Sequence, residues 1–212
     1  MQLPEPYFTR GLKPAVFIFA LVPLALLVWG LWQDTLGANP IEVVTRSLGE
    51  WALHFLLLTL LMSPLRRLGW SQALRLRRML GLLAFFYATL HLSSYVVLDQ
   101  FFDWEEIWLD ILERPFITVG MLAFLMLLAL AVTSPKAIMR KLGRYWQKLH
   151  WLIYPLTALV VLHFWWLADS KVQTDRPLIY TLLLGLLLAE RLWRSIQRKT
   201  SPSNKSGSWM RT

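Results

Sequence analysis

The sequence of 212 residues contains no cysteine. The chain therefore cannot form a disulfide, a cysteine-held iron–sulfur cluster, a thioether-linked haem or a zinc site built on thiolates. A thiol nucleophile is excluded for the same reason. Any metal ion would have to be held by histidine, carboxylate or methionine side chains.

Charged residues are also scarce, because they make up 17% of the chain whereas soluble proteins average about 25%. Apolar residues make up 56%. The charges gather between long uncharged stretches, which is typical of a protein that crosses a membrane several times. The net charge of +9 comes from basic residues at the ends of these stretches, so it indicates membrane topology and not nucleic-acid binding.

Six uncharged stretches predict an all-α, polytopic membrane protein with six transmembrane helices. They span residues 14–32, 51–65, 79–98, 115–135, 149–168 and 177–189. The second and sixth are shorter than the roughly 20 residues that a membrane-crossing helix needs. We expect the sixth to continue past Glu190 and Arg191 to Trp193, with the two charged heads at the interface. Residues 1–199 form one predicted domain, and the polar tail 200–212 is predicted to be disordered.

The distribution of basic residues predicts that both termini lie in the cytoplasm. Connections rich in Lys and Arg stay on the cytoplasmic side of a membrane. Eighteen of the 22 basic residues fall on one side of the predicted helices, together with both termini. The four on the other side are Arg46, Arg114, Lys171 and Arg176.

The connection between the third and fourth stretches predicts an amphipathic helix on the outer surface. Apolar residues recur there at helical spacing, and four acids share the opposite stripe. A solvated loop with a few apolar anchors is the alternative. The apolar residues are Phe101, Trp104, Trp108, Ile111 and Leu112, and the acids are Asp103, Glu106, Asp110 and Glu113.

Two histidines are predicted to lie at the same depth in the membrane, where ionisable groups are costly and are candidates for function. His91 lies 12 residues after the start of the third stretch, and His163 lies 14 residues after the start of the fifth. These separations put both roughly 20 Å from the inner surface. Both helices run outwards, so the two imidazoles could face each other, as in the ligation of b-type haem within a helical bundle.

Other interpretations of the histidines stay open. A buried histidine can instead be hydrogen-bonded to the backbone of a neighbouring helix. His54 lies at a similar depth on the second stretch and is a rival ligand. His150 lies at the cytoplasmic end of the fifth stretch, where it could ligate a second haem or contact the phosphate or propionate of a cofactor.

Basic residues at the cytoplasmic ends of the third and fifth stretches form a candidate anion site. Arg77 and Arg78 directly precede the third stretch, and Arg144 precedes the fifth. An anion bound between them and His150 would lie at the foot of both histidine-bearing helices. The alternative is that these arginines only set the topology.

Several runs of residues resemble those of a known family. They are RRMLGL at 77–82, TLHLSSY at 89–95 and GRYWQKLH at 143–150, with GANP at 37–40, RPF at 114–116 and RPLIY at 176–180. The sequence resembles, over residues 10–195, the MsrQ (YedZ) family. These are haem-binding membrane subunits of the periplasmic methionine sulfoxide reductase system, within the ferric-reductase-like transmembrane group.

The resemblance implies a six-helix inner-membrane protein that carries haem b and FMN. It would pass electrons from a quinol or a cytoplasmic flavin reductase to the periplasmic molybdopterin subunit MsrP. The family's haem histidines correspond to His91, His150 and His163, with no counterpart at His54. The larger ferric reductases carry two histidines on each of two helices, whereas the third stretch here carries only His91, which argues against a second bis-histidine haem.

The competing hypothesis is a transporter or membrane scaffold whose histidines carry protons or tie helices together. Transport favours acids or broken helices near the middle of the membrane, and the predicted spans have neither. The sequence also lacks a Walker loop, a nucleophile elbow and a metalloprotease histidine pair, so it predicts no independent substrate catalysis.

The topology can be tested with reporter fusions. Fusions at Trp104 and Asp175 should report the periplasm, and fusions at Gln72 and Gly143 the cytoplasm, because the basic connections are retained inside. Paired alkaline phosphatase and fluorescent protein reporters would measure this. Reversed signals at any of these positions would contradict the predicted orientation.

Overall fold

The computed structural model describes residues 4, 7–169 and 175–200, and these residues form helices and turns without a strand. The predicted all-α fold is confirmed. The tail predicted to be disordered lies, from residue 201 onwards, outside the described residues.

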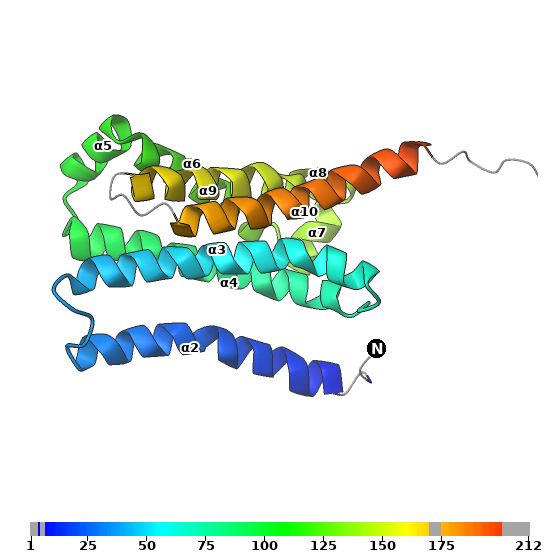
Figure 1. The fold of residues 1–212 in the computed structure, drawn as a ribbon, viewed down its shortest axis with the longest axis horizontal. Coiled ribbons are helices and arrows are strands. Elements are labelled where there is room, and N and C mark those ends of the chain that lie inside the picture. The colour runs from blue at the N-terminus through cyan, green and yellow to red at the C-terminus, as the bar shows by residue number, and fades with distance from the viewer. Residues whose placement is uncertain (1–3, 5–6, 170–174, 201–212) are drawn as a thin grey trace, which may run out of the picture.

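Long helices run side by side along the bundle (Figure 1). They are α2 (Lys13–Trp32), α3 (Pro40–Arg67), α4 (Ala73–Ser94), α6 (Pro115–Val132), α9 (Ile153–Asp169) and α10 (Asp175–Thr200). The shorter elements are η1 (Phe8–Leu12), η2 (Tyr95–Asp99), α5 (Trp104–Glu113), α7 (Lys136–Leu142), α8 (Arg144–Leu149) and η3 (His150–Leu152).

Five helical stretches in the described residues are long and apolar enough to cross a membrane. They are Phe8–Trp32, Pro40–Arg67, Ala73–Asp99, Pro115–Val132 and Arg144–Leu167. The chain is therefore a multi-pass membrane protein by length and composition. Helix α10 is not among the five, so the count of six crossings stays a prediction.

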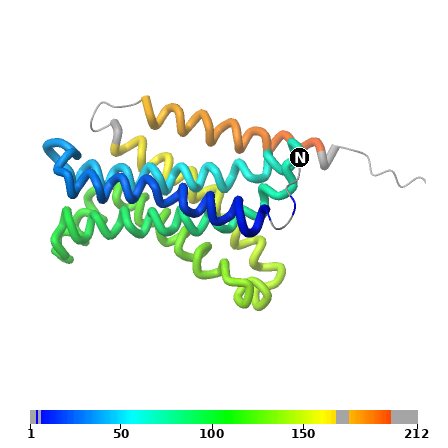
Figure 2. Tube along the Cα trace, turned by 90° about the horizontal axis from the view of Figure 1, so that it is seen from below, coloured from blue at the N-terminus to red at the C-terminus, as the bar shows by residue number. Residues whose placement is uncertain are grey.

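Both described ends of the chain lie at the same end of the bundle. The start of α2 and the end of α10 are both at this end, on opposite sides of the bundle, and α5 lies at the other end (Figure 1). Helices α7 and α8, which carry the basic connection, project from one side towards the end that holds the termini (Figure 2). On the predicted topology, the α5 end is periplasmic and the other end is cytoplasmic.

Helix α3 begins well before the predicted start at residue 51. Asn39 caps the helix, since its side-chain oxygen accepts a hydrogen bond from the Glu42 backbone N–H at 3.2 Å. Pro40 occupies the first helical position, where its missing N–H costs nothing. Glu42 then pairs with Arg46 one turn later at 3.0 Å. These charges interrupt the uncharged run, so the predicted stretch is shorter than the helix.

The core lies mainly between α3 and α4. Leu53, Leu56 and Leu60 repeat along one face of α3 at helical spacing and are almost fully buried. They pack in the same apolar cluster as residues of α4, including Leu83 and Tyr87. Helix α2 lies on the outside of this pair (Figure 1), and the Tyr87 hydroxyl donates to the Ala20 carbonyl of α2 at 2.6 Å.

Polar contacts join α10 to α3 at several levels. The Arg191 guanidinium, which was expected to reach the interface, donates to Ser63 at 2.7 Å and lies 4.8 Å from the ring centre of Tyr154, close to the charged end of α3. The contacts are Arg176 with Glu50 at 2.8 Å, Tyr180 with His54 at 2.9 Å, Arg191 with Ser63, and Arg67 with Glu190 at 2.5 Å. At the start of α10, the hydrogen bond with Glu50 raises the pKa of Arg176, which stays charged.

The predicted amphipathic helix is confirmed as α5, capped by the Asp103 carboxylate. The prediction that Asp110 shares an outer polar stripe is wrong. Asp110 is 3% exposed and accepts hydrogen bonds from Tyr95 at 2.7 Å and Gln100 at 3.1 Å. Arg114 pairs with it at 2.9 Å. A carboxylate with these three partners anchors α5 to the end of the bundle.

Replacing Asp110 with Ala should lower the free energy of unfolding by about 2–3 kcal/mol, because it leaves the partly buried Tyr95 hydroxyl without its acceptor and removes the partner of Gln100 and Arg114. Thermal unfolding of purified protein in detergent, followed by circular dichroism, would measure the change. Glu113→Ala on the same helix is the control, since Glu113 is exposed. Equal stability of the two variants would contradict an anchoring role.

Candidate functional site

The two histidines predicted to lie at equal depth are brought together. His91 projects from α4 and His163 from α9, and their ring centres lie 6.3 Å apart. The two ring planes are inclined at 76°. Both side chains are partly buried within the bundle.

Each histidine is held by a backbone carbonyl of a neighbouring helix. His91 Nδ1 donates to the Thr45 carbonyl of α3 at 2.8 Å. His163 Nδ1 donates to the Phe116 carbonyl of α6 at 2.6 Å. Because a carbonyl can only accept, Nδ1 carries the proton in each ring, and the neutral imidazole keeps its lone pair on Nε2. Both rings are therefore in the tautomer that binds a metal through Nε2.

A glycine stands one turn after each of these carbonyls. A Cβ added at Gly49 would lie 3.2 Å from the Cε1 and Nδ1 atoms of His91. A Cβ added at Gly120 would lie 2.9 Å from the same atoms of His163. Distances below 3.0 Å are essentially never seen for a real Cβ, so Gly120 cannot be exchanged without moving the ring. The two glycines create the space in which the imidazoles lie.

The two supports are built alike. In each case the histidine comes from a helix that runs towards the α5 end, and the carbonyl and glycine come from its antiparallel partner. The pairs are α4 with α3 and α9 with α6, which are also the most extensively packed helix pairs in the bundle. The site is thus formed by two similar helix hairpins that each present one imidazole.

The site lies near the α5 end of the bundle. Thr45 is the sixth residue of α3, and Phe116 is the second residue of α6. At about 1.5 Å per residue, both carbonyls lie within roughly two turns of the helix ends that face α5. On the predicted topology, this places the histidine pair close to the periplasmic surface.

The donor set suits a haem iron better than a bare metal ion. A structural or catalytic zinc needs three or four protein ligands, and the described residues contain no group of three or more His, Asp or Glu side chains placed for metal binding. Haem needs only axial ligands from the protein. An imidazole nitrogen lies about 2 Å from a ligated metal and about 1 Å from its own ring centre, so two axial imidazoles have ring centres roughly 6 Å apart. The observed separation matches this value.

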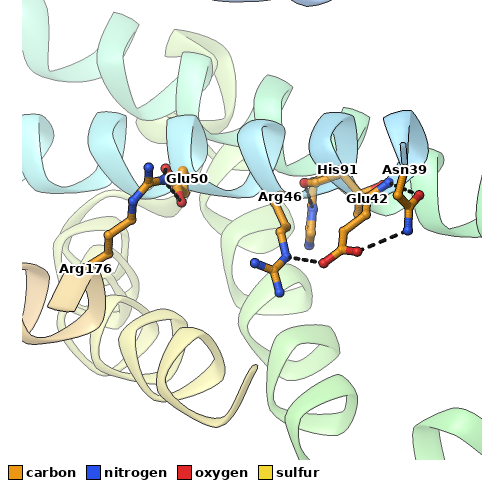
Figure 3. A network of polar contacts seen from close by, with 7 residues as sticks. Asn39, Glu42, Arg46, Glu50, His91 and Arg176 are labelled. Carbon is orange, nitrogen blue, oxygen red and sulfur yellow. Dashed lines mark hydrogen bonds and ion pairs between the residues drawn. The ribbon is translucent and has the colours of Figure 1, made fainter. Parts of the chain in front are cut away.

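Two buried polar atoms next to this site have no hydrogen-bond partner in the described part of the chain. They are Thr45 Oγ1 and Arg46 Nη2. Figure 3 shows Arg46 on the same face of α3 as Glu42, with His91 beside the helix. Buried polar groups are rarely left unpaired. A guanidinium N–H on this part of α3 could donate to a carboxylate of a bound cofactor.

His54, the rival ligand, lies in a different environment. Its Nε2 forms a hydrogen bond with the Tyr180 hydroxyl at 2.9 Å, and its ring lies 4.9 Å from that of Trp51. The Nδ1 atom is buried and has no partner among the described residues. The Nε2 atom of His54 is therefore used in joining α3 to α10, and only the buried Nδ1 is left without a partner among the described residues.

The remaining candidates, which lie at the other end of the bundle, contact different neighbours. His150 stacks on Trp146 with ring centres 4.0 Å apart, and its Nδ1 contacts the Trp146 carbonyl at 3.1 Å. Arg77 is partly buried and close enough to His150 and Arg191 to interact electrostatically with both. Arg78 lies on another face of α4, in a groove beside α2. Arg144 is exposed and lies over the ring of Tyr145.

Comparison with known proteins shows which family the chain belongs to. Residues 48–161 match the family described as the ferric reductase like transmembrane component. A protein-methionine-sulfoxide reductase heme-binding subunit MsrQ of Azospira oryzae is 50% identical over 92% of this chain and 83% of its own length.

The MsrQ proteins of two other bacteria are similarly close. That of Herminiimonas arsenicoxydans is 43% identical over 96% of this chain and 94% of its own length. That of Rhodospirillum rubrum is 51% identical over 88% of this chain and 90% of its own length. The chain belongs to the MsrQ family of ferric-reductase-like membrane proteins. No solved structure matches the chain.

Gly120→Ala should destabilise the protein by about 1–3 kcal/mol, because the new methyl group forces the His163 ring out of its place. Gly49→Ala should have a smaller effect, since its contact is less severe. Gly81→Ala is the matched control on α4, where an added Cβ meets an atom only at 4.0 Å. There the better helix propensity of Ala should stabilise the protein slightly. Thermal unfolding in detergent would rank the three variants, and equal stabilisation by all of them would contradict the tight fit at Gly120.

Proposed function

We propose that this protein is the haem-binding electron-transfer subunit of a protein-methionine-sulfoxide reductase. The observation that carries the proposal is the pair of imidazoles with ring centres 6.3 Å apart, each held through Nδ1 so that its Nε2 keeps a free lone pair. The names of the MsrQ relatives support haem as that ligand.

The residues of this chain have separable roles in the proposed site. His91 and His163 would hold the haem iron through their Nε2 atoms. The Thr45 and Phe116 carbonyls fix the tautomer and orientation of the two rings, and such partners also make an imidazole a stronger donor to the metal. Arg46 would pair with a haem carboxylate through its unpartnered Nη2 atom. Haem b in this position supplies a one-electron carrier within the membrane.

The proposed acceptor is the periplasmic subunit MsrP, with the protein in the bacterial inner membrane. The histidine pair lies near the α5 end, which the basic residues predict to be periplasmic. A carrier at this depth is close to an acceptor on the outer surface. The exposed tryptophans of α5, Trp104 and Trp108, are suited to the interface beside such an acceptor.

For the electron donor, we propose a quinol rather than a cytoplasmic flavin reductase. An electron from the cytoplasmic end would have to travel along α9 from the level of His150 to that of His163, which are 13 residues or about 20 Å apart. In contrast, an apolar groove of about 710 Å³ lies at the same end of the bundle as the site, lined mainly by residues of α5. It includes Leu92, next to His91, and Met121, next to Gly120. A lipid-soluble donor could approach the histidine pair there.

FMN, which the sequence resemblance implies, is proposed to bind at the cytoplasmic end of the bundle. Arg77 and Arg191 lie there with His150 and Tyr154, and cations so placed suit a phosphate group. His150 is proposed to contact this cofactor rather than the iron between His91 and His163. Arg78 lines a groove beside α2 and Arg144 lies over the Tyr145 ring, and their part in this cofactor site stays a prediction.

Absorption spectroscopy of purified variants tests the haem assignment. Wild-type protein made with adequate haem supply should show a reducible low-spin haem spectrum. His91→Ala and His163→Ala should each lose that spectrum or convert it to high spin, because one axial ligand is missing.

His54→Ala is the control, since His54 is bonded to Tyr180 and should be dispensable for haem. Loss of haem in His54→Ala alone would show that the ligand pair is assigned wrongly. Colourless wild-type protein would favour histidines that tie helices together, as in the transporter or scaffold hypothesis.

A further inference from the structure

A groove between α2 and α4 is charged at one end and apolar along the rest of its length. Its volume is about 450 Å³. Three cations line it, and no carboxylate does. The lining residues are Lys13, Phe17 and Leu21 of α2 and Arg75, Arg78, Met79, Leu82, Leu83 and Phe86 of α4.

The charged end follows from the order of residues along the two helices. Lys13 is the first residue of α2, and Arg75 and Arg78 lie in the first two turns of α4. Both helices begin at the same end of the bundle (Figure 1). The apolar lining residues follow at spacings of three and four, so they continue along the same face of each helix. The groove therefore has its cations where a membrane has its headgroups and its apolar wall where a membrane has its hydrocarbon.

Two of the cations are positioned by a buried aromatic ring. Phe8 is completely buried just before α2. Lys13 Nζ lies 5.4 Å from the centre of its ring, and the Arg75 guanidinium carbon lies 5.5 Å from it. Cation–π contacts at these distances are favourable. They hold a lysine and an arginine from different helices on one side of the groove mouth.

We propose that this groove binds an anionic phospholipid. The phosphate is bound by Lys13, Arg75 and Arg78, and an acyl chain lies against Phe17, Leu82 and Phe86. Basic pockets between transmembrane helices on the cytoplasmic side are suited to anionic headgroups. The apolar wall adds hydrophobic contact that a free phosphate ion could not use. A zwitterionic lipid such as phosphatidylcholine also carries a phosphate, but its choline cation would be repelled by the basic residues of the groove.

The bound lipid would also fasten α2 to the bundle. Helix α2 packs less closely on its neighbours than α3 and α4 pack on each other. Most of its large side chains, among them Ile18, Leu26 and Trp29, are exposed on the protein surface. An acyl chain in the groove would add apolar contacts between α2 and α4. Anionic lipid should therefore raise the temperature at which the protein unfolds.

The test uses the full-length protein, purified in a neutral detergent and titrated with phosphatidylglycerol or phosphatidylcholine. Native mass spectrometry would count bound lipids, and thermal unfolding would measure stabilisation. Phosphatidylglycerol should bind and stabilise, whereas phosphatidylcholine should do so far less. The variant Lys13→Gln, Arg75→Gln, Arg78→Gln should bind phosphatidylglycerol roughly a hundredfold more weakly, because each basic residue near an anionic lipid contributes to affinity.

The matched control removes three exposed cations from α7, as Lys136→Gln, Arg140→Gln, Lys141→Gln. It should bind the lipid like the wild type. A second variant, Leu82→Trp, fills the apolar part of the groove without changing charge and should also displace the lipid. Unchanged phosphatidylglycerol binding in either groove variant would overturn the proposal. Equal stabilisation by inorganic phosphate would overturn it too, since the site would then bind a soluble anion.

Discussion

The geometry of the histidine pair depends on one kind of interaction, a hydrogen bond from an imidazole to a carbonyl that already belongs to a helix. Such a carbonyl can accept a second bond only where a side chain can come close to the helix backbone. Gly49 and Gly120 provide that approach, one turn after Thr45 and Phe116. The carbonyls, in turn, decide which ring nitrogen is left for a metal. A methyl group on either helix would disturb all of these relations together.

The sequence predicted the histidine pair but not its supports. Two histidines at equal depth on two outward-running helices can be found by counting residues, because helical rise is constant. The supporting carbonyls are 46 and 47 residues away in the chain, and every residue type offers a carbonyl. Gly49 and Gly120 are the only supporting residues whose type is distinctive. Because glycine is common in membrane helices, they do not indicate a histidine site on their own. His54 also lies at the right depth, but its direction towards Tyr180 depends on how α10 packs.

Charged residues account for most of the differences between the expected and observed helices. The Asn39–Pro40 pair is a strong helix start, but charged residues in the first turns of α3 separate it from the uncharged stretch that follows. Asp110 was expected on the outside because acids alternate with apolar residues along α5. Its partners Tyr95 and Gln100 come from the preceding segment, and their donors make burial of the carboxylate favourable. Pairing of this kind depends on tertiary structure, which periodicity does not describe.

The site is divided between two helix hairpins, and this division affects how the protein would unfold. Each hairpin packs closely within itself, and the α3–α4 and α6–α9 pairs touch each other more sparsely. An iron ligated by both His91 and His163 would act as a cross-link between two halves that can form separately. The first event on losing the cofactor would then be separation of the hairpins, with each still helical, rather than melting of individual helices.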